Sequence, residues 1–467
     1  MKKLLILFTM VISLCVCAIG LTGCHSHELT KHDAVAVSCE TDGSSEYYSC
    51  ECGKFFADAE AKTEIAENSW VIEKTGHDMG EYVYNNDATC LQDGTETSTC
   101  ANGCGHTDSR VKADTMLSHD CDNTGLCSIC EEVQSDEFMA NEGYVAKTKG
   151  VYYESIADAL AVSGAKVVYV IGDTDENVSV SNILIVKKGV NYTGTATTPN
   201  AVEIDADLEV YAGSFSLAWT YYSYFSPDTK AVTIKLLDNI TFNKQQMVNR
   251  GTALTLDLNG YDVTSTANAY TRLFLIKDAF TITSSKEGSS IDLAVSSFAQ
   301  LSSDYTDCTL KVSNVQINQT EKASTDFILN YGSVVIENTE INVVGGKIFN
   351  LYGNLTLGEG TEVNVSGVLG TSLMNLSKKC VVTIDGATIN IAGFKVNGGG
   401  LFSMAEACSL IVEDINLTVV VDETYPASFI YKPRPCTVEL KAGTYNVSGA
   451  SGKYTINADG TWTKPTV

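Results

Sequence analysis

The segments 380–391, 408–419 and 436–447 read CVVTIDGATINI, CSLIVEDINLTV and CTVELKAGTYNV, and their leading cysteines lie 28 residues apart. Apolar residues recur at fixed offsets in all three segments. They are Val382, Leu410 and Val438, then Ile384, Val412 and Leu440, then Ile389, Leu417 and Tyr445. A fixed period of this length, built from short apolar strands, is typical of a chain that stacks on itself turn upon turn. These segments therefore predict a β-solenoid.

Short strands of alternating apolar and polar residues continue this pattern back to residue 231. Leading strands are predicted at 231–237, 253–258, 280–284, 309–313, 334–338, 354–359, 381–385, 409–413 and 437–441. Partner strands are predicted at 272–276, 327–331, 348–352, 373–377, 401–404 and 429–432. Alternation points Leu, Ile and Val inward and Thr, Asn, Lys and Glu outward. Proline, which removes a ladder donor, occurs only six times. About ten coils are expected, spaced by about 4.8 Å.

The strand pattern resembles the right-handed parallel β-helix of the pectate-lyase type, over about 320 residues. The resemblance implies a mainly β chain with the β-helix domain at 151–467. A polar linker is expected at 136–150, where the composition changes. Apolar residues Ile156, Ala159 and Leu160 predict a short helix that caps the first coil, and no second helix is expected after it.

Equivalent positions of successive coils should form columns of like residues. One predicted column holds Cys308, Gly332, Gly353, Cys380, Cys408 and Cys436 as small inward groups. A second holds Asn330, Asn350 and Asn375, followed by Ser403, as a hydrogen-bonded ladder. Trp462 is expected to cap the last coil.

The first residues have the features of an export signal. Lys2 and Lys3 precede an almost wholly apolar stretch that ends in Leu21-Thr22-Gly23-Cys24. The ending resembles the lipobox of bacterial lipoproteins. That resemblance implies a signal peptide at 1–23, a lipid anchor on Cys24, and a partner in the bacterial membrane. The chain after Cys24 should be extracytoplasmic at the cell surface, since no later apolar run is long enough to span a bilayer.

Residues 24–135 are rich in cysteine and histidine. All six histidines of the chain lie between His25 and His119, and nine of its 16 cysteines lie between Cys39 and Cys130. Chain order gives three sets of one His and three Cys: His32, Cys39, Cys50 and Cys52; His77, Cys90, Cys100 and Cys104; His119, Cys121, Cys127 and Cys130. Each set offers four ligands, enough for a closed structural zinc site. His25 and His27 are assigned to the tether and His106 to the surface.

The same segment, for example ATCLQDGTETSTCANGCGHTD at 88–108, resembles the zinc-ribbon-like Cys repeats of bacterial surface proteins. Only Cys127 and Cys130 have the common CxxC spacing. Disulfides remain the alternative, because exported proteins meet an oxidising environment. Full disulfide pairing of nine cysteines would leave one thiol unpaired, whereas three zinc sites with three cysteines each would use all nine. A segment this small and polar needs bound metal or disulfides for stability, because it cannot bury enough apolar surface.

Net charge is −26, from 57 acidic and 31 basic residues. A strongly acidic protein is repelled by nucleic acid and by anionic lipid surfaces, so nucleic acid is not an expected partner. Loose calcium binding is compatible with this charge, although no Asp-rich calcium loop occurs.

Two features bear on what the solenoid binds. The aromatic run at 219–225 offers Trp219, Tyr221, Tyr222 and Tyr224 as a platform for sugars, or as inward packing groups. Enzymes of the β-helix type need clustered carboxylates. Only Asp385, Glu413 and Lys441 suggest a charged column that could supply a carboxylate pair, and a solvated face is the better explanation of it. The expected function is therefore binding or adhesion to glycan or to a host surface, with a polysaccharide lyase or glycoside hydrolase as the alternative and a purely structural envelope protein as a third.

Overall fold

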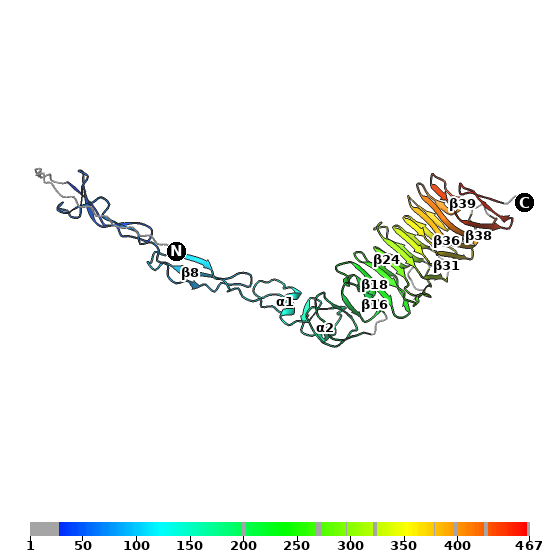
Figure 1. Ribbon diagram of the computed structural model, residues 1–467, viewed down its shortest axis with the longest axis horizontal. Coiled ribbons are helices and arrows are strands. Elements are labelled where there is room, and N and C mark those ends of the chain that lie inside the picture. The colour runs from blue at the N-terminus through cyan, green and yellow to red at the C-terminus, as the bar shows by residue number, and fades with distance from the viewer. Residues whose placement is uncertain are drawn as a thin grey trace, which may run out of the picture. The chain divides into compact units, whose positions relative to one another are not determined.

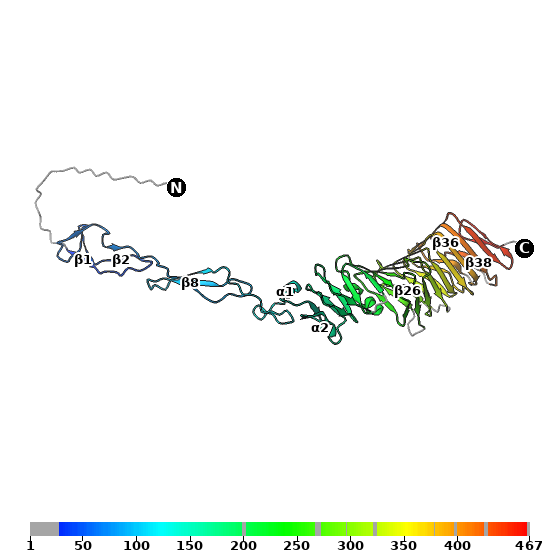
Figure 2. The same ribbon diagram turned by 60° about the horizontal axis from the view of Figure 1, so that its bottom comes forward.

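The structure, a computed structural model, describes residues 28–198, 202–266, 272–295, 297–320, 325–377, 379–396, 399–424 and 428–464. Two compact units make up the chain (Figures 1 and 2). The first contains the residues up to Asp120 together with Cys127–Glu131. The second contains Cys121–Leu126 and Glu132–Val467. The expected signal peptide at 1–23 and the lipidation site Cys24 lie outside the described residues.

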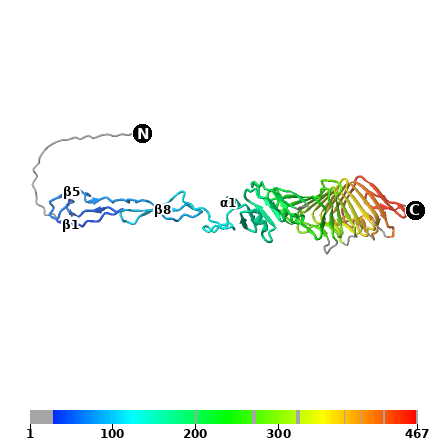
Figure 3. The ribbon, with the colours of Figure 1, turned by 90° about the horizontal axis from the view of Figure 1, so that it is seen from below.

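The first unit consists of small antiparallel sheets (Figure 3). A four-stranded sheet has the order β1 (Leu29–His32), β3 (Tyr47–Cys50), β4 (Phe55–Phe56) and β5 (Glu64–Ile65). β2 (Gly43–Ser44) pairs with β6 (Val71–Ile72). A three-stranded sheet holds β7 (Val83–Tyr84), β8 (Thr95–Thr99) and β9 (Thr107–Val111). Among its described apolar residues, only Phe56 and the four cysteines Cys39, Cys90, Cys100 and Cys127 are buried. Apolar burial this small cannot hold the unit together.

The second unit begins with a five-stranded sheet and two short helices. The sheet has the order β11 (Val151–Tyr153), β10 (Ala146–Thr148), β12 (Val167–Val170), β14 (Ile183–Val186) and β17 (Glu209–Ala212). β13 (Val178–Ser179) and β15 (Ala196–Thr197) form a separate pair. The helices are α1 (Asp136–Asn141) and α2 (Ile156–Ala161). The segment 136–150 is therefore not the expected linker, since it forms α1 and β10 and buries Met139 completely.

About 8 turns of a parallel β-solenoid follow (Figure 1). The leading row contains β18 (Ala231–Leu236), β21 (Ala253–Asp257), β24 (Ala279–Thr283), β27 (Thr309–Ser313), β30 (Ser333–Glu337), β33 (Asn354–Leu357) and β40 (Thr437–Leu440). The second row contains β19 (Ile240–Phe242), β22 (Val263–Ser265), β25 (Ser290–Leu293), β28 (Gln316–Gln319), β31 (Glu340–Val344), β34 (Glu362–Ser366) and β41 (Thr444–Gly449). Two long strands, β36 (Val381–Phe394) and β38 (Ser409–Val421), continue through both rows.

A third row closes each coil. It contains β20 (Gln246–Val248), β23 (Arg272–Ile276), β26 (Ser297–Leu301), β29 (Asp326–Asn330), β32 (Lys347–Leu351), β35 (Met374–Leu376), β37 (Gly400–Met404) and β39 (Ser428–Tyr431). The pairs within the three rows are parallel, while β16 (Val202–Asp205) and β42 (Gly452–Lys453) add antiparallel strands at the two ends. A final hairpin joins β43 (Thr455–Ile456) and β44 (Trp462–Thr463). The predicted leading and partner strands are thus confirmed, with fewer coils than expected.

The register follows the 28-residue repeat. Val382 lies opposite Leu410 and Leu410 opposite Val438, while Ile389 lies opposite Leu417. Inward residues of all three rows form one continuous apolar core with the side chains of Phe274, Phe298 and Phe327 in adjacent coils. This core confirms that one stack of apolar side chains runs through the solenoid.

The predicted column of small residues is correct, but the asparagine column is partly wrong. A Cβ atom at Gly353 would lie 2.0 Å from the carbonyl oxygen of Gly332, so these two coils approach too closely for a larger residue. Asn350 and Asn375 do lie in register and share a hydrogen bond of 3.1 Å. Asn330 instead lies opposite Leu351, points inward and is fully buried.

The helix that covers the first coil differs from the one expected. α2 packs into a separate apolar cluster with Val168 and Leu184. The cap is formed by a helix that the strand pattern did not predict, α3 (Phe215–Tyr221), which is followed by the 3₁₀ turn η1 (Tyr222–Tyr224). At the other end, Trp462 packs against Phe394 and Phe429, as predicted for the last coil.

Candidate metal centres and a polar groove

Four side chains from distant parts of the first unit converge in one centre: Cys39, His77, Cys100 and Cys104. Their ligand atoms all lie within 4.8 Å of one another. Cys39 Sγ is 3.8 Å from Cys100 Sγ, and Cys104 Sγ is 3.4 Å from His77 Nδ1. Cys100 directly follows β8, and the turn that leads to Cys104 is closed by the Gly103 N–H donating to the Cys100 carbonyl. We call this set the first centre.

A second centre repeats this arrangement with Cys90, His119, Cys127 and Cys130. Cys90 Sγ is 3.8 Å from Cys127 Sγ, and Cys130 Sγ is 3.6 Å from His119 Nδ1. Cys127 is completely buried. Three sulfur atoms and one imidazole nitrogen around one point form a donor set that can hold a metal ion.

Each centre contains one thiol whose pKa is lowered. Burial raises the pKa of Cys100, but hydrogen bonding from His77 and the Asn102 backbone N–H outweighs burial and lowers this pKa to about 6. Burial is likewise outweighed at Cys127, where the backbone N–H groups of Cys130 and Ile129 lower the pKa to about 5. These groups favour the thiolate, which is the form that binds metals.

His77 is held on both sides of its ring. Its Nδ1 faces the first centre, while its Nε2 lies 3.8 Å from Glu40 Oε1. The ring of His106 stacks on it with centroids 3.9 Å apart. His106 is exposed, as predicted for a surface residue, and the stacking on His77 also makes it a neighbour of the first centre. A carboxylate on the far nitrogen commonly orients a ligand histidine.

The grouping of ligands differs from the grouping inferred from chain order. Cys39 joins the residues of the second predicted set, and Cys90 joins those of the third. Cys39 lies in the loop closed by the Val35–Ser44 pairing, and Cys90 lies in the loop between β7 and β8, so both loops bring a cysteine to a ligand set that is distant along the chain.

Four of the predicted ligands lie outside the two centres. Cys121 packs beside Met139 and Tyr152 in the second unit. His32 Nε2 hydrogen-bonds Ser49 Oγ at 2.8 Å. The Cys52 N–H donates to Cys50 Sγ at 3.4 Å, so these two cysteines remain neighbours.

The aromatic run at 219–225 is mostly an inward cap. Trp219 is 5% exposed and Tyr222 is completely buried, and Trp219 packs against Phe242, Phe274 and Phe280. Neither ring can therefore stack on a sugar, which corrects the predicted platform. Tyr224 is 52% exposed, and its ring lies 5.9 Å from that of Tyr221.

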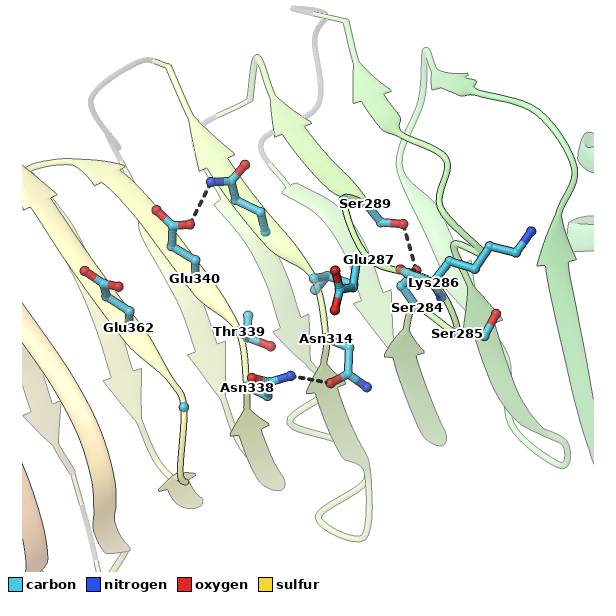
Figure 4. A pocket seen from close by; sticks show the side chains of 14 residues that line it. Ser284, Ser285, Lys286, Glu287, Ser289, Asn314, Asn338, Thr339, Glu340 and Glu362 are labelled. Atoms are coloured by element: carbon cyan, nitrogen blue, oxygen red, sulfur yellow. Dashed lines mark hydrogen bonds between the residues drawn. The ribbon is translucent and has the colours of Figure 1, made fainter.

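A polar groove of about 650 Å³ follows the corner between the leading and second rows (Figure 4). Its lining includes Ser284, Asn314, Gln316, Asn338, Glu340 and Glu362. Gln316 Nε2 donates to Glu340 Oε2 at 2.8 Å, and Asn338 Nδ2 donates to Asn314 Oδ1 at 2.6 Å. Glu340 and Glu362 lie opposite each other on β31 and β34. The groove thus presents hydrogen-bonding side chains at the spacing of the coils.

An asparagine ladder borders this groove and extends beyond it. Each side-chain amide donates to the residue of the preceding coil, at distances of 2.8 to 3.1 Å. The members in order are Asp292, Asn318, Asn342, Asn364 and Asn390. Sequence reasoning missed this ladder. Its signal is an apolar residue followed by asparagine once in each coil, as in Ile317-Asn318 and Ile341-Asn342.

The suspected charged column is broken by a register shift. Asp385 lies opposite Asp414 rather than Glu413. Glu413 instead forms an ion pair of 2.7 Å with Lys441. An exposed ion pair of this kind is typical of a solvated surface rather than of a catalytic carboxylate pair.

No protein family, curated protein or solved structure that we compared matches this chain. Within the part of the chain that the structure describes, none of the helices has the length and apolar character needed to cross a membrane.

Proposed function

We propose that the protein is a lipid-anchored binding protein of the bacterial surface, in which the β-solenoid binds a glycan. The observation that supports this function is the polar groove, where Gln316, Glu340 and Glu362 lie on rigid neighbouring strands. Hydroxyl-rich ligands are recognised by such fixed donors and acceptors. The solenoid core keeps their spacing fixed, so little ordering is required on binding.

The charge of the groove selects the kind of glycan. Glu287, Glu340 and Glu362 line it with a single cation, Lys286. Like charges repel strongly in a partly enclosed site, so a polyuronate is disfavoured. A neutral glycan, or one that carries amino groups, fits this charge.

Binding of the purified ectodomain to an array of neutral, amino and acidic glycans tests this function. Gln316→Ala and Glu340→Ala together should weaken binding at least about tenfold, since each removes a fixed hydrogen-bonding group. Lys441→Ala, on a distant coil, is the matched control and should bind as the wild type does. Equal binding by the double variant and the wild type would exclude the groove as the site.

One observation keeps hydrolysis as a second candidate function. Glu340 and Glu362 lie on adjacent parallel strands, a spacing near the roughly 5 Å of retaining glycosidases. Glu340 accepts hydrogen bonds from Gln316 and Asn342, and Glu362 accepts one from Asn390. These amide donors hold both carboxylates in fixed positions along the groove. Release of reducing ends by the wild type, but not by Glu340→Gln or Glu362→Gln, would establish the enzyme instead.

We further propose zinc as the metal of the two centres. A zinc tetrahedron with Zn–S bonds of about 2.3 Å has sulfur–sulfur edges of about 3.8 Å. The Sγ–Sγ distances of Cys39–Cys100 and Cys90–Cys127 are both 3.8 Å. A disulfide would require about 2.05 Å and would leave the histidines without a role. Four protein ligands per centre suit a closed structural site rather than a catalytic one. Metal analysis of the unreduced protein should find two zinc ions bound by these eight residues.

The anchor completes the proposed arrangement. A lipid on Cys24 would hold the first unit at the membrane, and the solenoid follows it along the chain. Cys24→Ser should move the protein from the membrane fraction to the soluble fraction. Retention in the membrane would contradict the anchor.

A further inference from the structure

The last three coils carry a column of thiols that neither the binding groove nor the metal centres use. Cys380 lies directly before the Val381–Ser409 pair, and Cys408 directly before the Ser409–Thr437 pair. Cys380, Cys408 and Cys436 are therefore stacked in register. Cys380 Sγ is 3.7 Å from Cys408 Sγ. Cys436 Sγ points to the carbonyl oxygen of Ala405 at 2.7 Å.

The backbone geometry at this column suits a covalent bond. Paired strands lie about 4.8 Å apart, and the Cα atoms of disulfide-bonded cysteines are usually about 4.4–6.8 Å apart. The spacing of neighbouring coils therefore falls within the range that a disulfide requires. Rotation of the two side chains can close the remaining gap between the sulfur atoms. Cys308 belongs to the same column, but the coils of Gly332 and Gly353 separate it from Cys380. The neighbouring thiols are therefore confined to the final three coils.

Access from solvent differs sharply along the column. Cys380 and Cys408 are each 1% exposed, whereas Cys436 is partly exposed. Burial raises the pKa of Cys380 to about 12, which makes this thiol a poor nucleophile toward an external oxidant. An oxidant in solution can reach the column only through Cys436.

We propose that Cys380 and Cys408 form a disulfide in the exported protein, and that Cys436 is the thiol through which oxidation enters. The oxidant is an external disulfide, either a small molecule or a protein. The Cys436 thiolate attacks it, forms a mixed disulfide and releases one thiol. Cys408 then attacks Cys436 Sγ and releases the second thiol. Cys380 finally attacks Cys408 Sγ and gives up its proton to the departing Cys436 thiolate, which restores the Cys436 thiol.

The reaction balances, because two protein thiols lose two hydrogens and the external disulfide becomes two thiols. The product joins the coils of Cys380 and Cys408, which lie directly before the terminal coil of Cys436. A terminal coil lacks a neighbour on one side and is the first to separate from a stack, and the bond limits how far that separation spreads. A bond across a 28-residue loop restricts the unfolded chain and so stabilises this end.

The test begins with the fully reduced ectodomain, refolded with zinc and exposed to oxidised glutathione. Peptide mapping under non-reducing conditions should find Cys380 linked to Cys408, after a Cys408–Cys436 intermediate. Cys436 and Cys308 should remain free for alkylation in denaturant. Complete alkylation of all four coil thiols after prolonged exposure would overturn the disulfide, and a final Cys408–Cys436 bond would overturn the last transfer.

Single variants distinguish the thiol through which oxidation enters from the thiols that form the final disulfide. Cys436→Ala should slow formation of the Cys380–Cys408 bond by about tenfold or more, because the two remaining thiols are buried. Cys308→Ala is the matched control and should oxidise at the wild-type rate. Oxidation should raise Tm of the wild-type solenoid by at least about 3 °C and leave Tm of Cys408→Ala unchanged. A wild-type rate for Cys436→Ala would exclude it as the entry point.

Discussion

Each of the two units of this protein has its own source of stability, and the two sources differ. The first unit buries Phe56 and four cysteines, and its convergent contacts are the two Cys/His centres. The solenoid buries one continuous column of Leu, Ile, Val and Phe across its coils. With the proposed metal bound, order in the first unit would depend on a few strong, specific contacts, whereas order in the solenoid is spread over many weak ones. The two units should consequently fail under different treatments.

Removal of metal should have the largest effect, and only on the first unit. A strong chelator at neutral pH should unfold it, because a structural zinc contributes on the order of 10 kcal/mol to the fold of a small domain. Hydrogen exchange followed by mass spectrometry should show loss of protection at 28–120, while the solenoid strands keep theirs. Unchanged protection in the first unit would show that metal does not hold it. Cys127→Ser should reproduce the effect of the chelator at the second centre.

A buried charge should produce the opposite pattern. Leu410 is completely buried between Val382 and Val438. Leu410→Asp should lower the free energy of unfolding of the solenoid by more than about 4 kcal/mol, because the carboxylate has no partner there. Urea titration measures the loss, and zinc content of the first unit is the control that should not change.

Close contact between coils can be tested at one glycine. Gly353→Ala places a methyl group against the Gly332 carbonyl and should cost about 1–3 kcal/mol of solenoid stability. Gly370→Ala is the matched control, since a Cβ there meets nothing within 4 Å. Similar urea midpoints for the two variants would contradict the close approach of these coils.

The smallest effect concerns an ion pair at the start of the second unit. Burial of Asp136 is outweighed by hydrogen bonds from Lys147, Lys187 and Tyr152, which lower its pKa to about 2. A lowered pKa stabilises the fold above the unfolded pKa near 4, and this contribution is lost as pH falls toward 2. After allowance for solvent screening, Asp136→Asn should lower stability by roughly 1–2 kcal/mol at pH 7. Urea titrations of variant and wild type should converge near pH 2.

Much of the solenoid was predictable, because alternation and a fixed period report register directly. The strands from 231 onward and the column at Cys380, Cys408 and Cys436 were read correctly. The prediction misplaced Asn330 because it aligned the coils by matching Asn330 with Asn350 and Asn375. Aligning Tyr331-Gly332 with Tyr352-Gly353 would have placed it opposite Leu351. The α3 cap was missed because its aromatic residues have no clear strand or helix period.

The metal centres were predictable in composition but not in grouping. The sequence contained the right residue types, and eight of the twelve predicted ligands lie in the two centres. Which cysteine joins which pair depends on long-range hairpin geometry, and spacing along the chain does not encode it. His106 and Glu40 were missed as neighbours of His77 for the same reason.

The exchange of ligands between sets has a mechanical consequence. The contact between Cys39 and Cys100 closes a loop of 61 residues, and the contact between Cys90 and Cys127 closes one of 37. Cys90 lies between Cys39 and Cys100 in the sequence, so the two loops share residues 90–100. Tension applied between Cys39 and Cys127 would load the proposed metal–sulfur bonds, whereas β1, which precedes Cys39, could still be peeled from β3. Such a segment would resist stretching by fluid flow far better than its small sheets alone would allow.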